Sequence, residues 1–148
     1  MVLPEFRRPL FDLLLERVRQ PRVFIQVLAG PRQVGKTTLV RQVLAATALP
    51  SHYASADDPT LRDRAWIETQ WASARLRARE GGRQGGLLVL DEAQKITAWS
   101  EVVKRLIREW NLATQAKAPG GAERSRVCRG LFSRMRRNAR RRQLRWFQ

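Results

Sequence analysis

Eight consecutive residues in the first third of the chain have the types and spacing of a loop that binds phosphate groups. They match the pattern G-x-x-x-x-G-K-[ST] and read Gly30, Pro31, Arg32, Gln33, Val34, Gly35, Lys36 and Thr37. The two glycines let backbone N–H groups close around phosphate oxygens, in a turn where a Cβ would clash or block the approach. We expect Lys36 to reach the β and γ phosphates and the Thr37 hydroxyl to bind Mg²⁺. The loop therefore predicts a site for a nucleoside triphosphate.

A pair of acidic residues later in the chain has the types needed for the rest of this chemistry. Asp91 and Glu92 follow the apolar run 87–90, which is typical of a buried strand whose carboxyl end opens at a ligand crevice. We expect Asp91 to bind Mg²⁺, directly or through a water molecule, and Glu92 to polarise the water that attacks the γ phosphate. An apolar run that ends in acids is also common at the solvated end of a strand, so this assignment depends on the phosphate loop.

These residues can meet only if strands and helices position them, and the hydrophobic pattern predicts that the two kinds of element alternate. Strands are expected at 23–29, 51–55 and 87–90. Helices are expected at 10–20, 38–48, 59–80 and 100–112. The second of these helices begins at Thr38, and its N-terminal dipole would point at the bound phosphate. The alternation predicts an α/β domain in which helices cover a mainly parallel sheet.

Charge divides the chain into two parts. The formal net charge is +16, and residues 113–148 hold 11 of the 29 Lys and Arg residues but only one of the 13 acidic residues. We therefore expect residues 1–112 to form the folded domain. Residues 113–148 are expected to be an Arg-rich tail that is disordered or partly helical.

Cysteine and histidine are too scarce for a disulfide or a zinc site. The single cysteine, Cys128, cannot form an intramolecular disulfide, and His52 is the only histidine. The apolar residues near the start of the chain are interrupted by Asp12 and Glu16 and are too few to span a membrane. We expect a soluble, cytoplasmic protein.

Three segments of the sequence resemble one protein family. They read G-P-R-Q-V-G-K-T-T-L at 30–39, A-D-D-P-T-L-R-D at 56–63 and L-D-E-A-Q-K-I at 90–96. Together they are similar to bacterial and archaeal AAA-type ATPases in which a P-loop domain precedes a nuclease-like C-terminal domain. The resemblance covers residues 1 to about 112. It implies a domain that binds ATP and Mg²⁺, with Glu92 as a catalytic residue one position after the metal-binding Asp91.

The sequence departs from this family after residue 112. In such ATPases the next strand carries a polar sensor residue, and in related folds it lies between the phosphate-loop strand and the strand of the acidic pair. No such strand is predicted in the Arg-rich tail, so we expect an incomplete sheet with two open edges at its middle. Without this strand, we expect Mg²⁺-dependent ATP hydrolysis to be weak or absent and the chain to be only partly folded.

Three interpretations of the tail are open. It is a basic arm that binds nucleic acid through phosphates, a basic helix that lies against an acidic partner, or the product of a frameshift or truncated reading frame. We favour the third, because Arg outnumbers Lys 25 to 4, as expected of a GC-rich gene. The functions that compete with ATP binding are those of a basic nucleic-acid-associating fragment and of a helicase-like motor remnant. The chain is too short for the second motor domain that a helicase needs.

Overall fold

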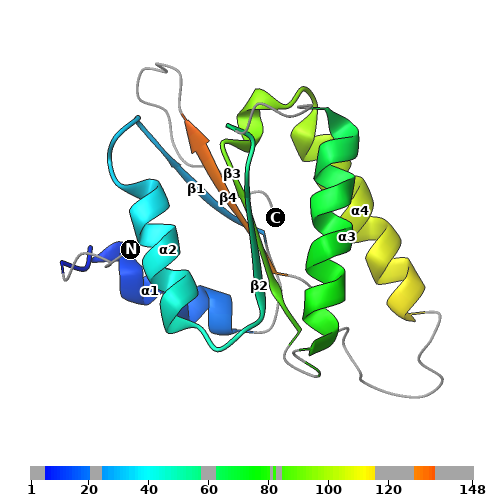
Figure 1. The fold of residues 1–148 in the computed structure, drawn as a ribbon, viewed down its shortest axis with the longest axis horizontal. Helices are drawn as coiled ribbons and strands as arrows, with labels where there is room; N and C mark the ends of the chain where they lie inside the picture. Colours follow the sequence, from blue (N-terminus) through cyan, green and yellow to red (C-terminus); the bar gives the residue numbers. More distant parts are fainter. Residues whose placement is uncertain are drawn as a thin grey trace.

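A four-stranded parallel sheet with helices on both faces forms the described part of the chain (Figure 1). The computed structural model describes residues 6–20, 25–57, 63–80, 82, 85–115 and 129–135. The strands are β1 (Gln26–Gly30), β2 (Ser51–Ser55), β3 (Leu87–Asp91) and β4 (Arg129–Met135), in the sheet order β1-β4-β3-β2. The helices are α1 (Leu10–Arg19), α2 (Lys36–Ala46), α3 (Arg64–Glu80) and α4 (Trp99–Gln115), and a short 3₁₀ helix, η2 (Ala93–Lys95), follows β3.

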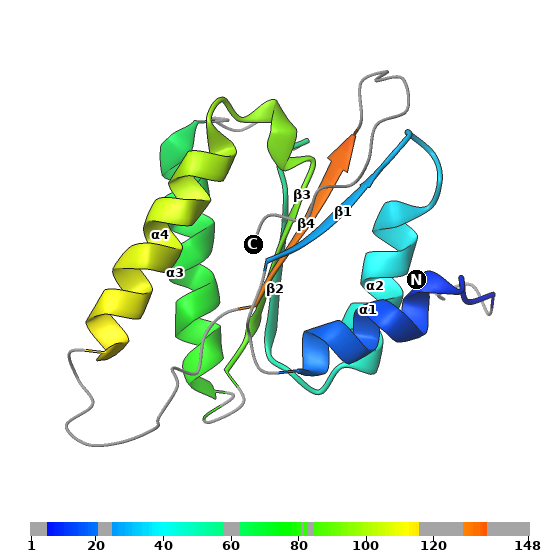
Figure 2. The ribbon, with the colours of Figure 1, turned by 180° about the vertical axis from the view of Figure 1, so that it is seen from behind.

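Strand β3 contributes to the hydrophobic clusters on both faces of the sheet, because it is buried on both sides. Leu88 and Leu90 pack among α3 and α4, whereas Leu87 and Val89 pack among α1 and α2. This division follows from the alternation of side chains along a strand, and both helical layers are visible from either side of the sheet (Figures 1 and 2). The same alternation places the side chain of Asp91 on the α1 and α2 face, where α2 begins.

The elements predicted from the hydrophobic pattern agree with the observed ones, and the α/β class is confirmed. The expected strand at 51–55 is β2, and the other predicted elements start or end within a few residues of their expected bounds, whereas η2 and β4 were not predicted. Helix α3 begins at Arg64, where the Asp63 carboxylate accepts a hydrogen bond from the Trp66 N–H at 2.9 Å. The start predicted at Pro59, with Asp58 as its cap, lies outside the described residues. In the part of the chain that the structure describes, no helix has the length and apolar character needed to cross a bilayer.

The central strand that we expected to be missing is present. Residues 129–135 form β4, which pairs in parallel with β1 on one side and with β3 on the other. Val27 of β1 and Val89 of β3 are in register with Phe132 and Leu131 of β4. A strand pairs through its backbone, so an Arg-rich composition does not prevent a short segment from filling this position.

The presence of β4 changes two expectations about the tail. Because β1 and β3 are joined through β4, the sheet has no open edges at its middle, and the reason for expecting a partly folded chain is lost. The description of 113–148 as wholly disordered or partly helical is also wrong at 129–135. The rest of the tail beyond Gln115 lies outside the described residues.

Candidate functional site

The predicted phosphate loop connects β1 to α2 at the carboxyl edge of the sheet, the upper edge in Figure 1. Gly30 is the last residue of β1 and Lys36 is the first residue of α2. The Leu39 N–H donates to the Gly35 oxygen at 2.9 Å, so the first turn of α2 starts directly at the loop. The N–H groups and the positive end of the helix dipole in this turn favour an anion at the same place.

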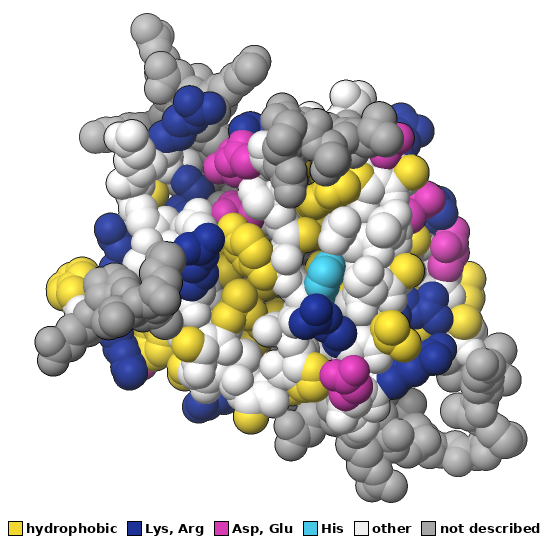
Figure 3. All heavy atoms as spheres, in the orientation of Figure 1, with side chains coloured by type: hydrophobic (Ala, Val, Ile, Leu, Met, Phe, Trp, Pro, Cys, Tyr) yellow, Lys and Arg dark blue, Asp and Glu magenta, His cyan; other side chains and the backbone are white. Residues whose placement is uncertain are grey.

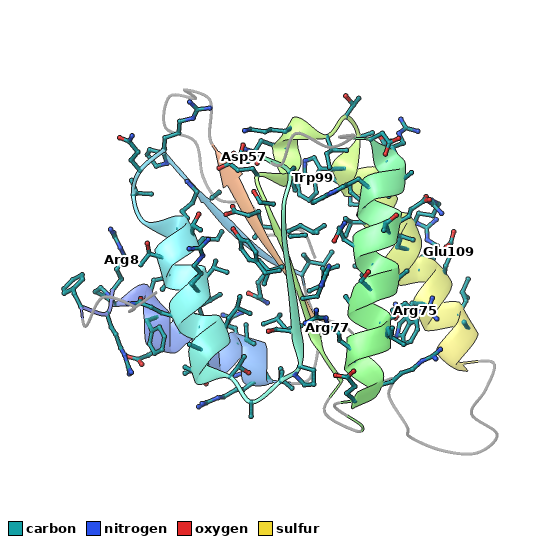
Figure 4. The ribbon with its side chains drawn as sticks, in the orientation of Figure 1. Arg8, Asp57, Arg75, Arg77, Trp99 and Glu109 are labelled. Atoms are coloured by element: carbon teal, nitrogen blue, oxygen red, sulfur yellow. The ribbon has the colours of Figure 1, made fainter. Side chains whose placement is uncertain are left out.

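The two glycines of the loop have different roles within the chain. Gly35 has a φ of 78°, in the left-handed region that only glycine adopts without strain, and a Cβ there would lie 2.8 Å from a guanidinium nitrogen of Arg8. Arg8 lies beside the start of α2 (Figure 4). A Cβ on Gly30 would meet Val34 at 3.6 Å, an ordinary contact. Within the chain, the backbone conformation therefore requires glycine at Gly35, where the atom nearest an added Cβ is the flexible end of Arg8, whereas a Cβ on Gly30 would fit.

The Lys36 ammonium folds back into the loop. It donates hydrogen bonds to the Gly30 oxygen at 3.2 Å and to the Pro31 oxygen at 2.6 Å. Of the other predicted loop residues, Pro31, Arg32, Gln33 and Thr38 are exposed and Val34 is half-buried. Lys36 is thus the cation that the loop holds at its centre.

Thr37 and Asp91 meet, as the two motifs predict. The Thr37 hydroxyl donates to Asp91 Oδ2 at 2.8 Å, although 54 positions separate the two residues in the sequence. Asp91 is only 4% exposed, and its other oxygen, Oδ1, accepts from the Glu92 N–H at 3.0 Å. Hydrogen bonds to a charged group are worth about 1.5 to 3 kcal/mol each, which offsets the cost of burying this carboxylate.

Tyr53 is a third contact of Asp91 that the sequence analysis missed. Its hydroxyl donates to the same Oδ2 at 2.8 Å. Burial of the phenol, together with its hydrogen bond to the Asp91 carboxylate, raises the pKa of Tyr53 to about 12. The phenol therefore stays a neutral donor at neutral pH. Tyr53 lies on β2 directly across from Val89 of β3, and only the pairing of these two strands reveals that it shares a face with Asp91.

Glu92 lies in a constrained turn just after β3. Its backbone is left-handed, with a φ of 53°, and its carboxylate accepts a hydrogen bond from the Gln94 amide nitrogen. The other amide atom, Gln94 Oε1, is buried without a hydrogen-bond partner among the described residues. Gln94 thus holds the Glu92 side chain at the edge of the site.

An ion pair joins two of the segments on which the family resemblance depends. The Lys95 ammonium, in η2, pairs with the Asp57 carboxylate just beyond the end of β2. Asp57 lies at the same edge of the sheet as the phosphate loop (Figure 4). The pair therefore connects the segment that follows the acidic pair to the end of the edge strand.

The site offers few metal ligands from the protein, which suits Mg²⁺ bound partly by phosphates and water. Among the described residues, no group of three or more His, Cys, Asp or Glu side chains is placed to hold a metal ion. Thr37 and Asp91 offer one hydroxyl and one carboxylate. Mg²⁺ is commonly bound by one or two carboxylates together with substrate phosphates and water, and this arrangement matches that set.

The fold and these contacts define a P-loop nucleotide-binding α/β domain, and comparisons with known proteins give the family. A family model described as an AAA domain matches residues 23–117, and the chain belongs to this family. AAA domains bind and hydrolyse ATP and generally use Mg²⁺. Comparison with curated protein sequences finds no match.

A solved structure supports the same fold. The chain is similar to the crystal structure of Cdc6p from Pyrobaculum aerophilum, with a TM-score of 0.56 and 17% sequence identity. The match covers 89% of this chain and 40% of that chain, so the present sequence spans less than half the length of Cdc6p. At this identity the likeness shows the fold alone.

Proposed function

We propose that the chain binds Mg·ATP at the loop 30–37 and hydrolyses it with Glu92 as the catalytic residue. The observation that carries this proposal is the 2.8 Å hydrogen bond between Thr37 and Asp91, which brings together the two predicted Mg²⁺ ligands beside Lys36. The motifs around Asp57 and Lys95 favour the group of bacterial and archaeal AAA-type ATPases named above.

In this proposal each side chain has a separate task. Lys36 exchanges the oxygens of Gly30 and Pro31 for oxygens of the β and γ phosphates, and the loop N–H groups bind the same anion. Thr37 and Asp91 hold Mg²⁺, which when bound neutralises charge on the phosphates.

Glu92 orients and deprotonates the attacking water through a carboxylate lone pair that the hydrogen bond from Gln94 does not occupy. The hydrogen bond from Gln94 holds the carboxylate in place for this role. Strand β4 occupies the place in the sheet where we expected the sensor strand to be missing.

Two substitutions test the assignment of roles. Glu92→Gln should keep nucleotide affinity and lower the rate of phosphate release by about 10² to 10⁴-fold, because it removes a general base. Asp91→Asn should also weaken the Mg²⁺ dependence of binding. Phosphate release and calorimetric titration with ADP, each with and without Mg²⁺, measure the two effects. Equal phosphate release by wild type and Glu92→Gln would rule out the catalytic role.

A second proposal concerns nucleic acid, and it rests on the charge of the tail. On the face shown in Figure 3, acidic side chains lie among the basic ones, so that face carries mixed charge. Residues 113–148 carry +10 of the formal net charge of +16, because 11 Lys and Arg residues there accompany one acid. We propose that these arginines bind DNA or RNA through phosphates without sequence preference, and binding measured at increasing salt tests it.

A further inference from the structure

The carboxylate of Asp91 is held by three donors that come from three different parts of the fold. Thr37 at the start of α2 and Tyr53 on β2 both donate to Oδ2, at 2.8 Å each. The Glu92 N–H, just after β3, donates to Oδ1 at 3.0 Å. A carboxylate has about four lone-pair positions, two on each oxygen. Both positions on Oδ2 are therefore taken, and one position on Oδ1 is left.

Tyr53 is itself fixed by its surroundings. Its ring packs against the core cluster between the sheet and the pair of α1 and α2. The Arg41 guanidinium, one helical turn beyond Thr37, lies 5.8 Å from the centre of the ring, a distance suited to a cation–π contact. Core packing and the Arg41 guanidinium together restrict the orientation of the Tyr53 ring, and therefore the position of its hydroxyl.

We propose that Tyr53 is a positioning residue that decides which oxygen of Asp91 is offered to Mg²⁺. By occupying Oδ2 together with Thr37, the phenol leaves Oδ1 as the oxygen that reaches the metal or its water. Without the phenol, Oδ2 has a vacant lone pair and the carboxylate can offer either oxygen. This inference rests on the proposed Mg²⁺ site, and it adds a residue of the edge strand β2 to that site.

The substitution Tyr53→Phe tests the proposal because it removes only the hydroxyl. Loss of a hydrogen-bond partner behind a metal ligand typically weakens metal affinity by about 10 to 100-fold. We expect ADP affinity in EDTA to equal that of the wild type, and the Mg²⁺ concentration that half-maximally enhances ADP binding to rise by about that factor. Calorimetric titrations of ADP at graded Mg²⁺ concentrations measure both quantities.

His52 offers a matched control on the same strand. It is adjacent to Tyr53, so its side chain is on the opposite face of β2, where its ring nitrogen Nε2 is 2.7 Å from Gln70 Oε1. His52→Leu also removes one hydrogen bond from β2 but has no contact with Asp91. The His52→Leu variant should therefore show the same Mg²⁺ dependence of ADP binding as the wild type. An equal loss in both variants would show that β2 acts only through stability, and would overturn the proposal.

A second measurement needs no substitution at Tyr53. Because the chain contains a single tyrosine, labelling with 3-fluorotyrosine gives one ¹⁹F signal. We expect this signal to shift when Mg²⁺ is added to the ADP complex, and to stay in place when Mg²⁺ is added to the Asp91→Asn variant with ADP. A wild-type signal that Mg²⁺ does not move would overturn the proposal.

The outcomes separate this inference from the proposed function. Mg²⁺-dependent ADP binding in the wild type with an unchanged Tyr53→Phe variant would overturn the role of Tyr53 alone. A wild type whose ADP binding does not respond to Mg²⁺ would overturn the metal site, and the role of Tyr53 with it.

Discussion

Replacing Lys36 by Met separates the binding role of this side chain from its small role in stability. Met keeps most of the apolar stem and removes the ammonium, which donates to the Gly30 oxygen at 3.2 Å and to the Pro31 oxygen at 2.6 Å. Both acceptors lie in a loop that water can reach, so we expect the free energy of unfolding to fall by only about 1 kcal/mol. The variant should therefore remain folded.

The effect on binding should be much larger. Two unit charges about 4 Å apart attract by roughly 4 kcal/mol at the effective dielectric constant near a protein surface, and each ~1.4 kcal/mol changes affinity tenfold. Lys36→Met should therefore weaken ADP binding by about 10³-fold. The assay is calorimetric titration with Mg·ADP, after circular dichroism has shown that the variant is folded.

Lys104 in α4 provides the control for a simple loss of charge. It belongs to the helix layer on the face of the sheet away from α2, and Lys104→Met lowers the net charge by the same amount. This variant should bind Mg·ADP with wild-type affinity. Unchanged affinity in a folded Lys36→Met variant, or an equal loss in both variants, would refute the assignment of the phosphate loop.

The remaining predictions concern the loop glycine and the tail. Gly35→Ala should lower the free energy of unfolding by about 1 to 2 kcal/mol, because a left-handed residue acquires a Cβ, and it should abolish ADP binding. Gly82→Ala is its control in thermal and calorimetric measurements: the φ of Gly82 is +53° and its added Cβ would meet nothing within 4 Å, so binding should be retained. Removal of residues 136–148 should reduce both DNA affinity and its dependence on salt, and DNA binding that is unaltered by this deletion would exclude these residues as its source.

Much of the site was predictable because its residues belong to short motifs. The spacing of Gly30, Gly35 and Lys36 fixes a loop between a strand and a helix, and the apolar run before Asp91 fixes a buried strand. Parallel strands bring their carboxyl ends to one edge of the sheet, so the meeting of Thr37 with Asp91 followed from the two motifs. These inferences needed only local sequence and the geometry of α/β sheets.

The features that were missed depend on which strands are neighbours. Tyr53 reaches Asp91 because β2 pairs with β3 in a register that places the tyrosine on the same face, and neither motif contains that register. Strand β4 was missed for a different reason. Arg129, Ser133 and Arg134 interrupt its apolar residues, whereas Leu87–Asp91 begins with an unbroken apolar run. A hydrophobic pattern alone therefore assigned the segment to the basic tail.

Hydrogen exchange with and without Mg·ADP tests the central claim most directly, because it locates the bound nucleotide on the chain. If the nucleotide lies in the loop 30–37, amide exchange should slow in that loop and in the first turn of α2, and it should change little in α3 and α4. The Lys36→Met variant should lose this protection. Exchange that is unaltered at 30–37 under saturating Mg·ADP, or protection confined to another part of the chain, would contradict the account.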